Sequence, residues 1–211
     1  MAMAEHPVLT EVGQNASGTL RLAEQALWVA LGIVALAIAA KVQIPLWPSP
    51  VPVTMGTLAV LGIGAAYGPR LGLATILGYM IVGALGFDVF AGSSAAVNGW
   101  SYMLGGTGGY LAGYVMATIA LGWCARSGWD RSVVGMALAM LLGNAVIYAA
   151  GMAWLYVLVD GGMFNADRFA SPVAQTLAWG LTPFLIGDAI KLALAALLLP
   201  ALWKLVGNVR A

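Results

Sequence analysis

Long apolar runs without a charged residue constrain the fold of this chain more than any other feature. No charge occurs between Phe169 and Gly187, and none occurs between Leu192 and Trp203. Charged side chains make up 8% of the 211 residues, whereas a soluble domain carries about 25%. A helix of about 20 apolar residues crosses the hydrocarbon core of a bilayer. The sequence therefore predicts an all-α integral membrane protein.

Turn and charge signals divide the apolar sequence into six transmembrane helices. Four prolines between Val42 and Val53 exclude a helix there and indicate an ordered, extended loop. The run Gly68-Pro69-Arg70 is a helix-stop and turn signal. The predicted spans cover residues 22–40, 54–67, 71–87, 107–125 and 133–159, with a last span that ends near 206 and kinks near Pro183.

The chain divides into a polar, loosely ordered N-terminal tail at 1–21, a six-helix membrane domain at 22–206 and a C-terminal tail at 207–211. Six spans place both termini on one side, and an excess of Lys and Arg marks the cytoplasmic side. The side of the termini carries Arg21, Arg70, Arg126, Arg131, Lys204 and Arg210, and the other side carries Lys41 and Arg168. Both termini are therefore predicted to be cytoplasmic.

One acid and one base interrupt the last apolar run. Asp188 and Lys191 are three residues apart, so a helix places them on one face. Each costs about 2.5–3.5 kcal/mol at the centre of a membrane helix, so such residues usually face a protein interior or a cavity. Asp188 lies about 24 Å before Lys204 along a helix, which places the pair in the outer half of the bilayer. The pair is a candidate binding site, and a structural ion pair is the alternative.

Other polar side chains are weaker candidates for a pocket. Asn98 lies in a segment of small residues and is either a ligand contact or an ordinary turn asparagine. Asn144 and Tyr148 share one face of the fifth span, where bonds between helices are the alternative. Trp47, in the proline-rich segment, either covers a ligand or anchors the chain at the membrane interface.

Small residues recur at four-residue spacing in two spans. Such spacing lets helix backbones approach closely. In the fourth span the series predicts packing within the bundle, and it consists of Gly105, Gly109, Gly113 and Ala117. In the first span the spacing occurs as two separate pairs, Ala26 with Ala30 and Ala35 with Ala39. These pairs serve either internal packing or docking of another membrane subunit.

Several function classes lack the residues that they require. The only histidine is His6 and the only cysteine is Cys124, so neither a transition-metal site nor a histidine-dependent intramembrane protease is expected. The sequence has no P-loop motif, so any ATP-driven process needs a separate ATPase. The formal net charge of +1 argues against a nucleic-acid partner. We therefore expect no cofactor and no catalytic residues.

Six short segments carry a resemblance to a known family. They read Lys-Val-Gln-Ile-Pro-Leu from Lys41, Val-Pro-Val-Thr from Val51, Gly-Pro-Arg from Gly68, Phe-Ala-Gly from Phe90, Thr-Gly-Gly-Tyr-Leu from Thr107 and Gly-Asp-Ala-Ile-Lys from Gly187. With these segments in this order, the chain resembles the BioY family of bacterial biotin transporters over about residues 22–205. Members are the substrate-binding membrane components (S components) of energy-coupling factor (ECF) transporters.

The resemblance implies a six-helix bundle in the bacterial cytoplasmic membrane, with a biotin pocket on its outer side. It also implies a coupling transmembrane subunit and separate ATPase subunits as partners. Asp188 and Lys191 match the family's Gly-Asp-x-x-Lys, Tyr110 lies in the Thr-Gly-Gly-Tyr motif, and Asn98 corresponds by spacing to a loop asparagine that contacts the ligand. Gly56 stands where relatives usually have Gln, which puts a polar contact there in doubt.

A carboxylate such as Asp188 can accept the two ureido N–H groups of biotin, and Lys191 can donate to the ureido carbonyl. Three other functions are also compatible with these residues. The chain could be an S component for another vitamin such as thiamine, an intramembrane enzyme, or a packing subunit without a ligand.

Overall fold

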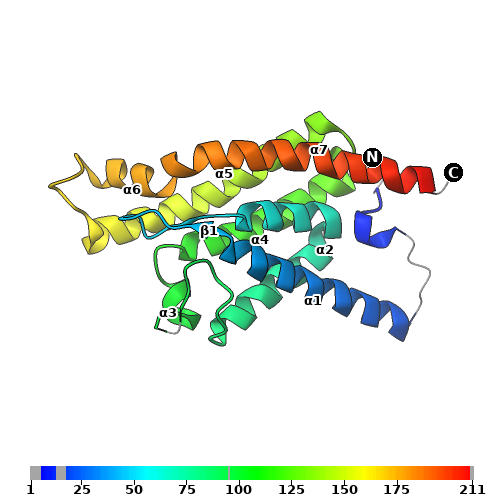
Figure 1. The fold of residues 1–211 in the computed structure, drawn as a ribbon, viewed down its shortest axis with the longest axis horizontal. Coiled ribbons are helices and arrows are strands. Elements are labelled where there is room, and N and C mark those ends of the chain that lie inside the picture. Colours follow the sequence, from blue (N-terminus) through cyan, green and yellow to red (C-terminus); the bar gives the residue numbers. More distant parts are fainter. Residues whose placement is uncertain (1–5, 13–17, 95, 210–211) are drawn as a thin grey trace.

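The computed structural model describes residues 6–12, 18–94 and 96–209. These form a helical bundle with one short hairpin (Figure 1). The helices are α1 (Thr19–Lys41), α2 (Gly56–Ala84), α3 (Gly99–Met103), α4 (Gly108–Arg126), α5 (Val133–Leu158), α6 (Pro172–Gly180) and α7 (Leu185–Val209). Shorter turns are η1 (Leu9–Glu11), η2 (Trp129–Arg131), η3 (Val159–Met163) and η4 (Thr182–Phe184), and the strands are β1 (Gln43–Ile44) and β2 (Val53–Thr54).

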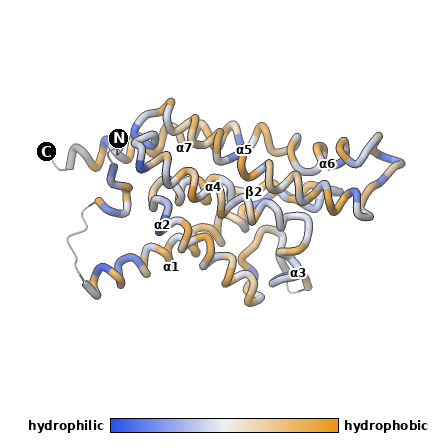
Figure 2. The backbone as a smooth tube through the Cα atoms, turned by 180° about the vertical axis from the view of Figure 1, so that it is seen from behind, coloured by the Kyte–Doolittle hydropathy of each residue, from blue (hydrophilic) through white to orange (hydrophobic). Residues whose placement is uncertain are grey.

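Among the described residues, five helical segments are long and apolar enough to cross a membrane. They are Thr19–Lys41, Gly56–Ala84, Gly108–Arg126, Val133–Met163 and Pro172–Val206. Figure 2 shows that apolar residues cover most of the length of these helices, with hydrophilic residues mainly at the ends of the bundle. The prediction of an all-helical membrane protein is confirmed at this level.

The segment α2 changes direction at Gly68, where φ is 74° and ψ is 179°. The left-handed φ favours glycine, and Pro69 then starts the second half of α2 with its fixed backbone angle. A Cβ added at Gly72 would lie 3.6 Å from the Cα of Gly64, so the two halves fold back against each other. The turn signal in the sequence marks this reversal correctly.

The fourth predicted span is α4, and it packs between α2 and α5. A Cβ at Gly113 would lie 2.8 Å from the Cα of Ile147, and one at Gly109 would lie 2.6 Å from the carbonyl oxygen of Ala150. Both contacts are with α5. The series of small residues therefore serves packing within the bundle, as predicted.

The last predicted span is interrupted near Pro183, as the sequence indicates. The helix α6 ends at Gly180, and η4 separates it from α7, which begins at Leu185. Leu181 has φ −130° and ψ −61°, which is not helical. The break places Asp188 in the first turn of α7, because a new helix starts only three residues before it.

The proline-rich segment forms the predicted ordered, extended loop between α1 and α2. Its ends pair as the antiparallel strands β1 and β2, with Gln43 opposite Thr54 and Ile44 opposite Val53. The Ser49 hydroxyl donates a hydrogen bond of 2.9 Å to the carbonyl oxygen of Trp179 in α6. The loop therefore spans from α1 to the opposite side of the bundle.

The expectation of a loosely ordered N-terminal tail is wrong for residues 6–12. The side chain of Val8 is fully buried and contacts the turn at Gly68. Glu11 forms a bidentate ion pair with Arg126 at the end of α4. In one of its two hydrogen bonds, Arg126 Nη1 donates to Glu11 Oε2 over 2.7 Å. The remaining tail residues, 1–5 and 13–17, and residues 210–211 of the predicted C-terminal tail lie outside the described residues.

Candidate functional site

The predicted acid–base pair forms a buried contact in the first turns of α7. Lys191 Nζ donates to Asp188 Oδ1 over 2.8 Å. Each residue is only 6% exposed. The spacing of three residues therefore gives the shared helix face that the sequence predicts. Because neither charge is exposed to water, the surrounding protein must supply the remaining hydrogen bonds.

Two hydroxyl groups from other helices complete this pair. Thr57, at the start of α2, donates to Asp188 Oδ1 over 3.3 Å and accepts a bond of 3.0 Å from Lys191 Nζ. The Tyr148 hydroxyl of α5 donates to Asp188 Oδ2. Three helices thus meet at one carboxylate, which accepts from an ammonium and two hydroxyls. We call Asp188, Lys191, Thr57 and Tyr148 the polar cluster.

All four residues of the polar cluster line a cavity of about 60 Å³. The other walls are mostly aromatic and aliphatic side chains from α2, α4, α5 and the loops. They include Tyr79, Phe90, Tyr102, Tyr110, Leu111, Tyr114, Ile147 and Phe184. Such a cavity combines mostly apolar walls with a few polar groups, which is the usual form of a site for a small organic molecule.

Two loops contribute to the lining of the cavity. Val51 and Pro52 contribute from the proline-rich segment, and Phe90 and Ala91 contribute from the segment after α2. The Phe90 ring stacks on Tyr102 with 4.9 Å between ring centroids. These loops are therefore well packed, since Phe90 is only 1% exposed.

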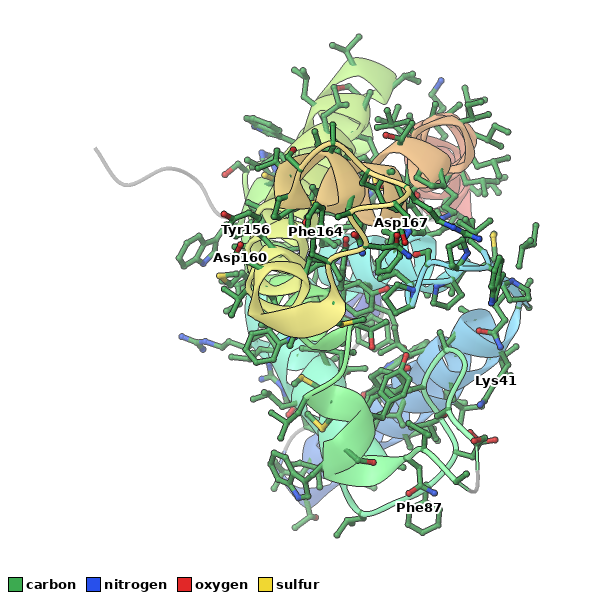
Figure 3. All side chains as sticks on the ribbon, turned by 90° about the vertical axis from the view of Figure 1, so that its left-hand side faces the viewer. Lys41, Phe87, Tyr156, Asp160, Phe164 and Asp167 are labelled. Atoms are coloured by element: carbon green, nitrogen blue, oxygen red, sulfur yellow. The ribbon has the colours of Figure 1, made fainter. Side chains whose placement is uncertain are left out.

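An exposed ion pair lies at the same end of the molecule. Lys41, at the end of α1, contacts Asp88 Oδ1 over 2.6 Å, and Ser93 donates to the same oxygen. Hydrogen bonds from Lys41 and Ser93, and the charge of Lys41, hold the pKa of the Asp88 carboxyl below its usual value. Figure 3, which faces this end, shows Lys41 beside α1, and it shows Asp160, Phe164 and Asp167 with the segment between α5 and α6.

Only part of the predicted site set lines the cavity. Asp188 and Lys191 do so, and so does Tyr110, whose hydroxyl donates to the carbonyl oxygen of Gly180 over 2.7 Å. Trp47 does not; it is 85% exposed, and its ring lies 5.3 Å from the guanidinium of Arg168.

Asn98 and Asn144 also lie outside the cavity lining. Asn98 is half-buried at the start of α3, and its Oδ1 faces the backbone at Gly86. Asn144 lies one helical turn before Tyr148 on α5 and is 9% exposed. Its Oδ1 has no hydrogen-bond partner within the part of the chain that the structure describes.

Sequence reasoning missed the hydroxyl groups that α2 and α4 contribute. Thr57 belongs to the polar cluster, and Tyr114 forms a side-chain hydrogen bond with Thr54. A Cβ at Gly56 would lie 3.0 Å from both the Thr54 Oγ1 and the Tyr114 hydroxyl. The glycine therefore leaves room for this pair of hydroxyls. The only signal in the sequence was that these polar groups stand within apolar runs.

No group of three or more His, Cys, Asp or Glu side chains suited to a metal ion occurs within residues 6–12, 18–94 and 96–209. The polar cluster itself offers one carboxylate beside an ammonium group. Such a set is suited to hydrogen bonds with a ligand that has both N–H donors and a carbonyl acceptor.

Known proteins resemble this chain over most of its length. The chain is 34% identical over 170 residues to the probable biotin transporter BioY of Pyrococcus horikoshii, and the match covers 81% of this chain and 90% of that protein. It is 29% identical over 170 residues to the biotin transporter BioY of Thermotoga maritima, with the same two coverages of 81% and 90%.

The fold also matches a solved structure. The crystal structure of the S-component for biotin from an ECF-type ABC transporter superposes with a TM-score of 0.67. The two sequences are 19% identical, and the match covers 90% of this chain and 95% of the other. A family model described as the BioY family matches residues 11–208. The chain therefore belongs to the BioY family.

Proposed function

We propose that this protein is the biotin-binding membrane component of an ECF-type uptake system. One observation carries the proposal: the polar cluster lines an aromatic cavity, in the fold of the S-component for biotin. The family membership and the two relatives named as biotin transporters support the same conclusion. The protein is a transport component and not an enzyme.

The ligand chemistry fits the cavity. Biotin has a ureido ring with two N–H donors and one carbonyl acceptor. Asp188 accepts the ureido N–H groups, and Lys191 donates to the ureido carbonyl. Bonds to charged groups in a cavity shielded from water are the strong kind. The apolar thioether ring then packs against aromatic walls such as Tyr110 and Tyr114.

Ligand entry requires the cavity to widen. Its volume of about 60 Å³ is well below the about 300–1,000 Å³ of ordinary ligand pockets. The two loops that line the cavity, which contribute Val51 and Pro52 and Phe90 and Ala91, can move without breaking helices. We propose that the proline-rich segment acts as a stiff lid carrying Trp47, and that movement of the segment at 88–106 brings Asn98 to the ligand. Asn144, one turn before Tyr148 on α5, has an unpartnered Oδ1 among the described residues, and we propose that it reaches the ligand when the cavity widens.

The membrane topology follows from charge and from the break in α2. Counting the two halves of α2 separately gives six crossings and places both termini on one side. Arg21, Arg70 and Arg126 line one cavity together with residues of η1, and the start of α1 lies at the same end of the bundle as the end of α7 (Figure 1). This distribution supports cytoplasmic termini in a bacterial cytoplasmic membrane, with lipid around the exposed apolar side chains.

A coupling subunit is proposed to dock on α1. In the span of α1 only 11% of residues are buried. Ala26 and Ala30 lie on one side of α1, and Ala35 and Ala39 lie on the opposite side. Ala39 is half-buried and the other three are exposed, so a second helix can approach closely at either pair. Because the sequence has no P-loop motif, separate ATPase subunits must drive any ATP-dependent uptake.

Mass spectrometry of small molecules carried through purification tests the function. Recovery of intact biotin from the folded protein is the expected result, and recovery of another vitamin such as thiamine would replace biotin as the ligand. A chemically altered substrate in place of the intact ligand would contradict a role in transport alone.

A further inference from the structure

A second cavity, separate from the polar cluster, lies near the start of α1. It has a volume of about 400 Å³. Its walls come from η1, the first turns of α1, the reversal of α2 and the end of α4. The lining residues are Thr10, Glu11, Arg21, Gln25, Tyr67, Arg70, Leu71, Ala74 and Arg126. Four segments thus bring three arginines and one glutamate together.

The charges in this cavity do not balance. Glu11 forms the bidentate ion pair with Arg126. The salt bridges among the described residues leave Arg21 and Arg70 without a carboxylate partner. Residues 13–17, which follow η1, read Gly-Gln-Asn-Ala-Ser and add no acid. The charge of Arg21 also acts on Glu11, whose pKa it helps to lower, but three arginines still face one glutamate. An anion in the cavity would therefore offset the excess positive charge of the lining.

The chemistry of the lining suits a phosphate group. Planar guanidinium groups bind phosphate oxygens in pairs of parallel hydrogen bonds. Arg70 and Leu71 belong to the first turn after Pro69, the end at which a helix favours an anion. Gln25 and Tyr67 add further hydrogen-bond donors.

The position of the cavity indicates where the phosphate comes from. Leu71 and Ala74 form an apolar wall beside the arginines. Leu20 and Leu22, on either side of Arg21, are 71% and 66% exposed, so acyl chains can lie along this end of α1. Hydrophilic residues mark the start of α1 in Figure 2. Basic pockets between membrane helices at the cytoplasmic interface commonly hold anionic lipid head groups.

We propose that this cavity binds the phosphate of an anionic phospholipid in the cytoplasmic leaflet. The cytoplasmic location rests on the topology proposed above, whereas selectivity for an anionic lipid does not. The ion pair of Glu11 with Arg126 leaves Arg21 and Arg70 as the groups that hold the phosphate.

Native mass spectrometry of the purified chain tests the proposal. The protein is mixed with equal amounts of phosphatidylglycerol and phosphatidylcholine in detergent, and the ratio of the two lipids retained is measured. We expect the wild type to prefer phosphatidylglycerol, and Arg21→Gln combined with Arg70→Gln to lower that ratio at least about tenfold. Lys204→Gln combined with Arg210→Gln, which removes the same charge near the C-terminus, should leave the ratio within about twofold.

A competition with inorganic phosphate on the wild type separates the two sources of phosphate. Displacement of phosphatidylglycerol by millimolar phosphate would support one phosphate site that the lipid normally fills. Equal retention of both lipids, or an unchanged ratio in the arginine variant, would overturn the proposal. Binding of phosphate without any lipid preference would overturn the lipid assignment.

Biotin titration of the same samples keeps this result apart from the proposed transport function. The wild type and both variants should bind biotin equally, because neither arginine lies near the polar cluster. Failure of all samples to bind biotin would contradict the transport function and leave the lipid result standing.

Discussion

Replacing Asp188 with asparagine separates a ligand contact from a structural ion pair. Asparagine keeps the shape of the side chain and one acceptor for Lys191, but it removes the charge. The side chain is 8% exposed, so solvent screens the lost interaction little. A hydrogen bond to a charged group contributes about 1.5–3 kcal/mol. We therefore expect Asp188→Asn to weaken biotin binding between about tenfold and about 150-fold.

The same change also acts on stability, so the design needs a second variant. Removing one partner of a buried ion pair costs about 3–5 kcal/mol, because the other charge stays buried without compensation. Combining Asp188→Asn with Lys191→Met removes both charges. We expect this double variant to regain thermal stability in the absence of ligand, but not to regain biotin binding.

Isothermal titration with biotin, beside thermal unfolding without ligand, reads out both effects. Tyr148→Phe, which removes one hydroxyl from the Asp188 carboxylate, is expected to give a smaller loss of affinity. Wild-type affinity in Asp188→Asn, together with a lowered unfolding temperature, would refute the reasoning. In that case the pair would serve only to hold α7 against its neighbours.

Three further predictions concern the docking face, the lid and a buried acid. Replacing Ala35 and Ala39 with leucine should reduce co-purification with a coupling subunit and leave biotin titration unchanged; lost biotin binding would mean that this face packs internally. Trp47→Phe should remove a biotin-dependent change in fluorescence, and Trp47→Ala should speed biotin release more than it slows entry; unchanged release with silent fluorescence would contradict a lid. Burial raises the pKa of the Asp130 carboxyl above its usual value, so the folded state binds a proton more tightly than the unfolded state. Stability therefore falls as the pH rises from the pKa of the unfolded state to that of the folded state. The unfolding temperature of the wild type should therefore drop relative to Asp130→Asn as the pH rises above about 4, and a constant difference would count against this.

The elements that the sequence predicts well depend on strong local signals. Absence of charge identifies the apolar helices, and Gly68-Pro69 marks the reversal of α2 because few other residues adopt a positive φ followed by a new helix. The pair at Asp188 and Lys191 is predicted by spacing alone, since residues three apart share a helix face.

The features that were missed depend on how distant segments meet. Thr57 reaches Asp188 across 131 positions in the sequence, and nothing local indicates which way the start of α2 is rotated. Val8 is buried only because the turn at Gly68 and the end of α4 form a surface for it. Its seven-residue segment has no periodicity of its own, so composition suggested a loose tail.

The central claim is that the aromatic cavity with its polar cluster recognises biotin. Titration of the purified wild-type protein with biotin and, separately, with thiamine tests it most directly. We expect saturable binding of one biotin per chain and no binding of thiamine at the same concentrations. Binding of thiamine in place of biotin, or of neither vitamin by a folded protein, would contradict it.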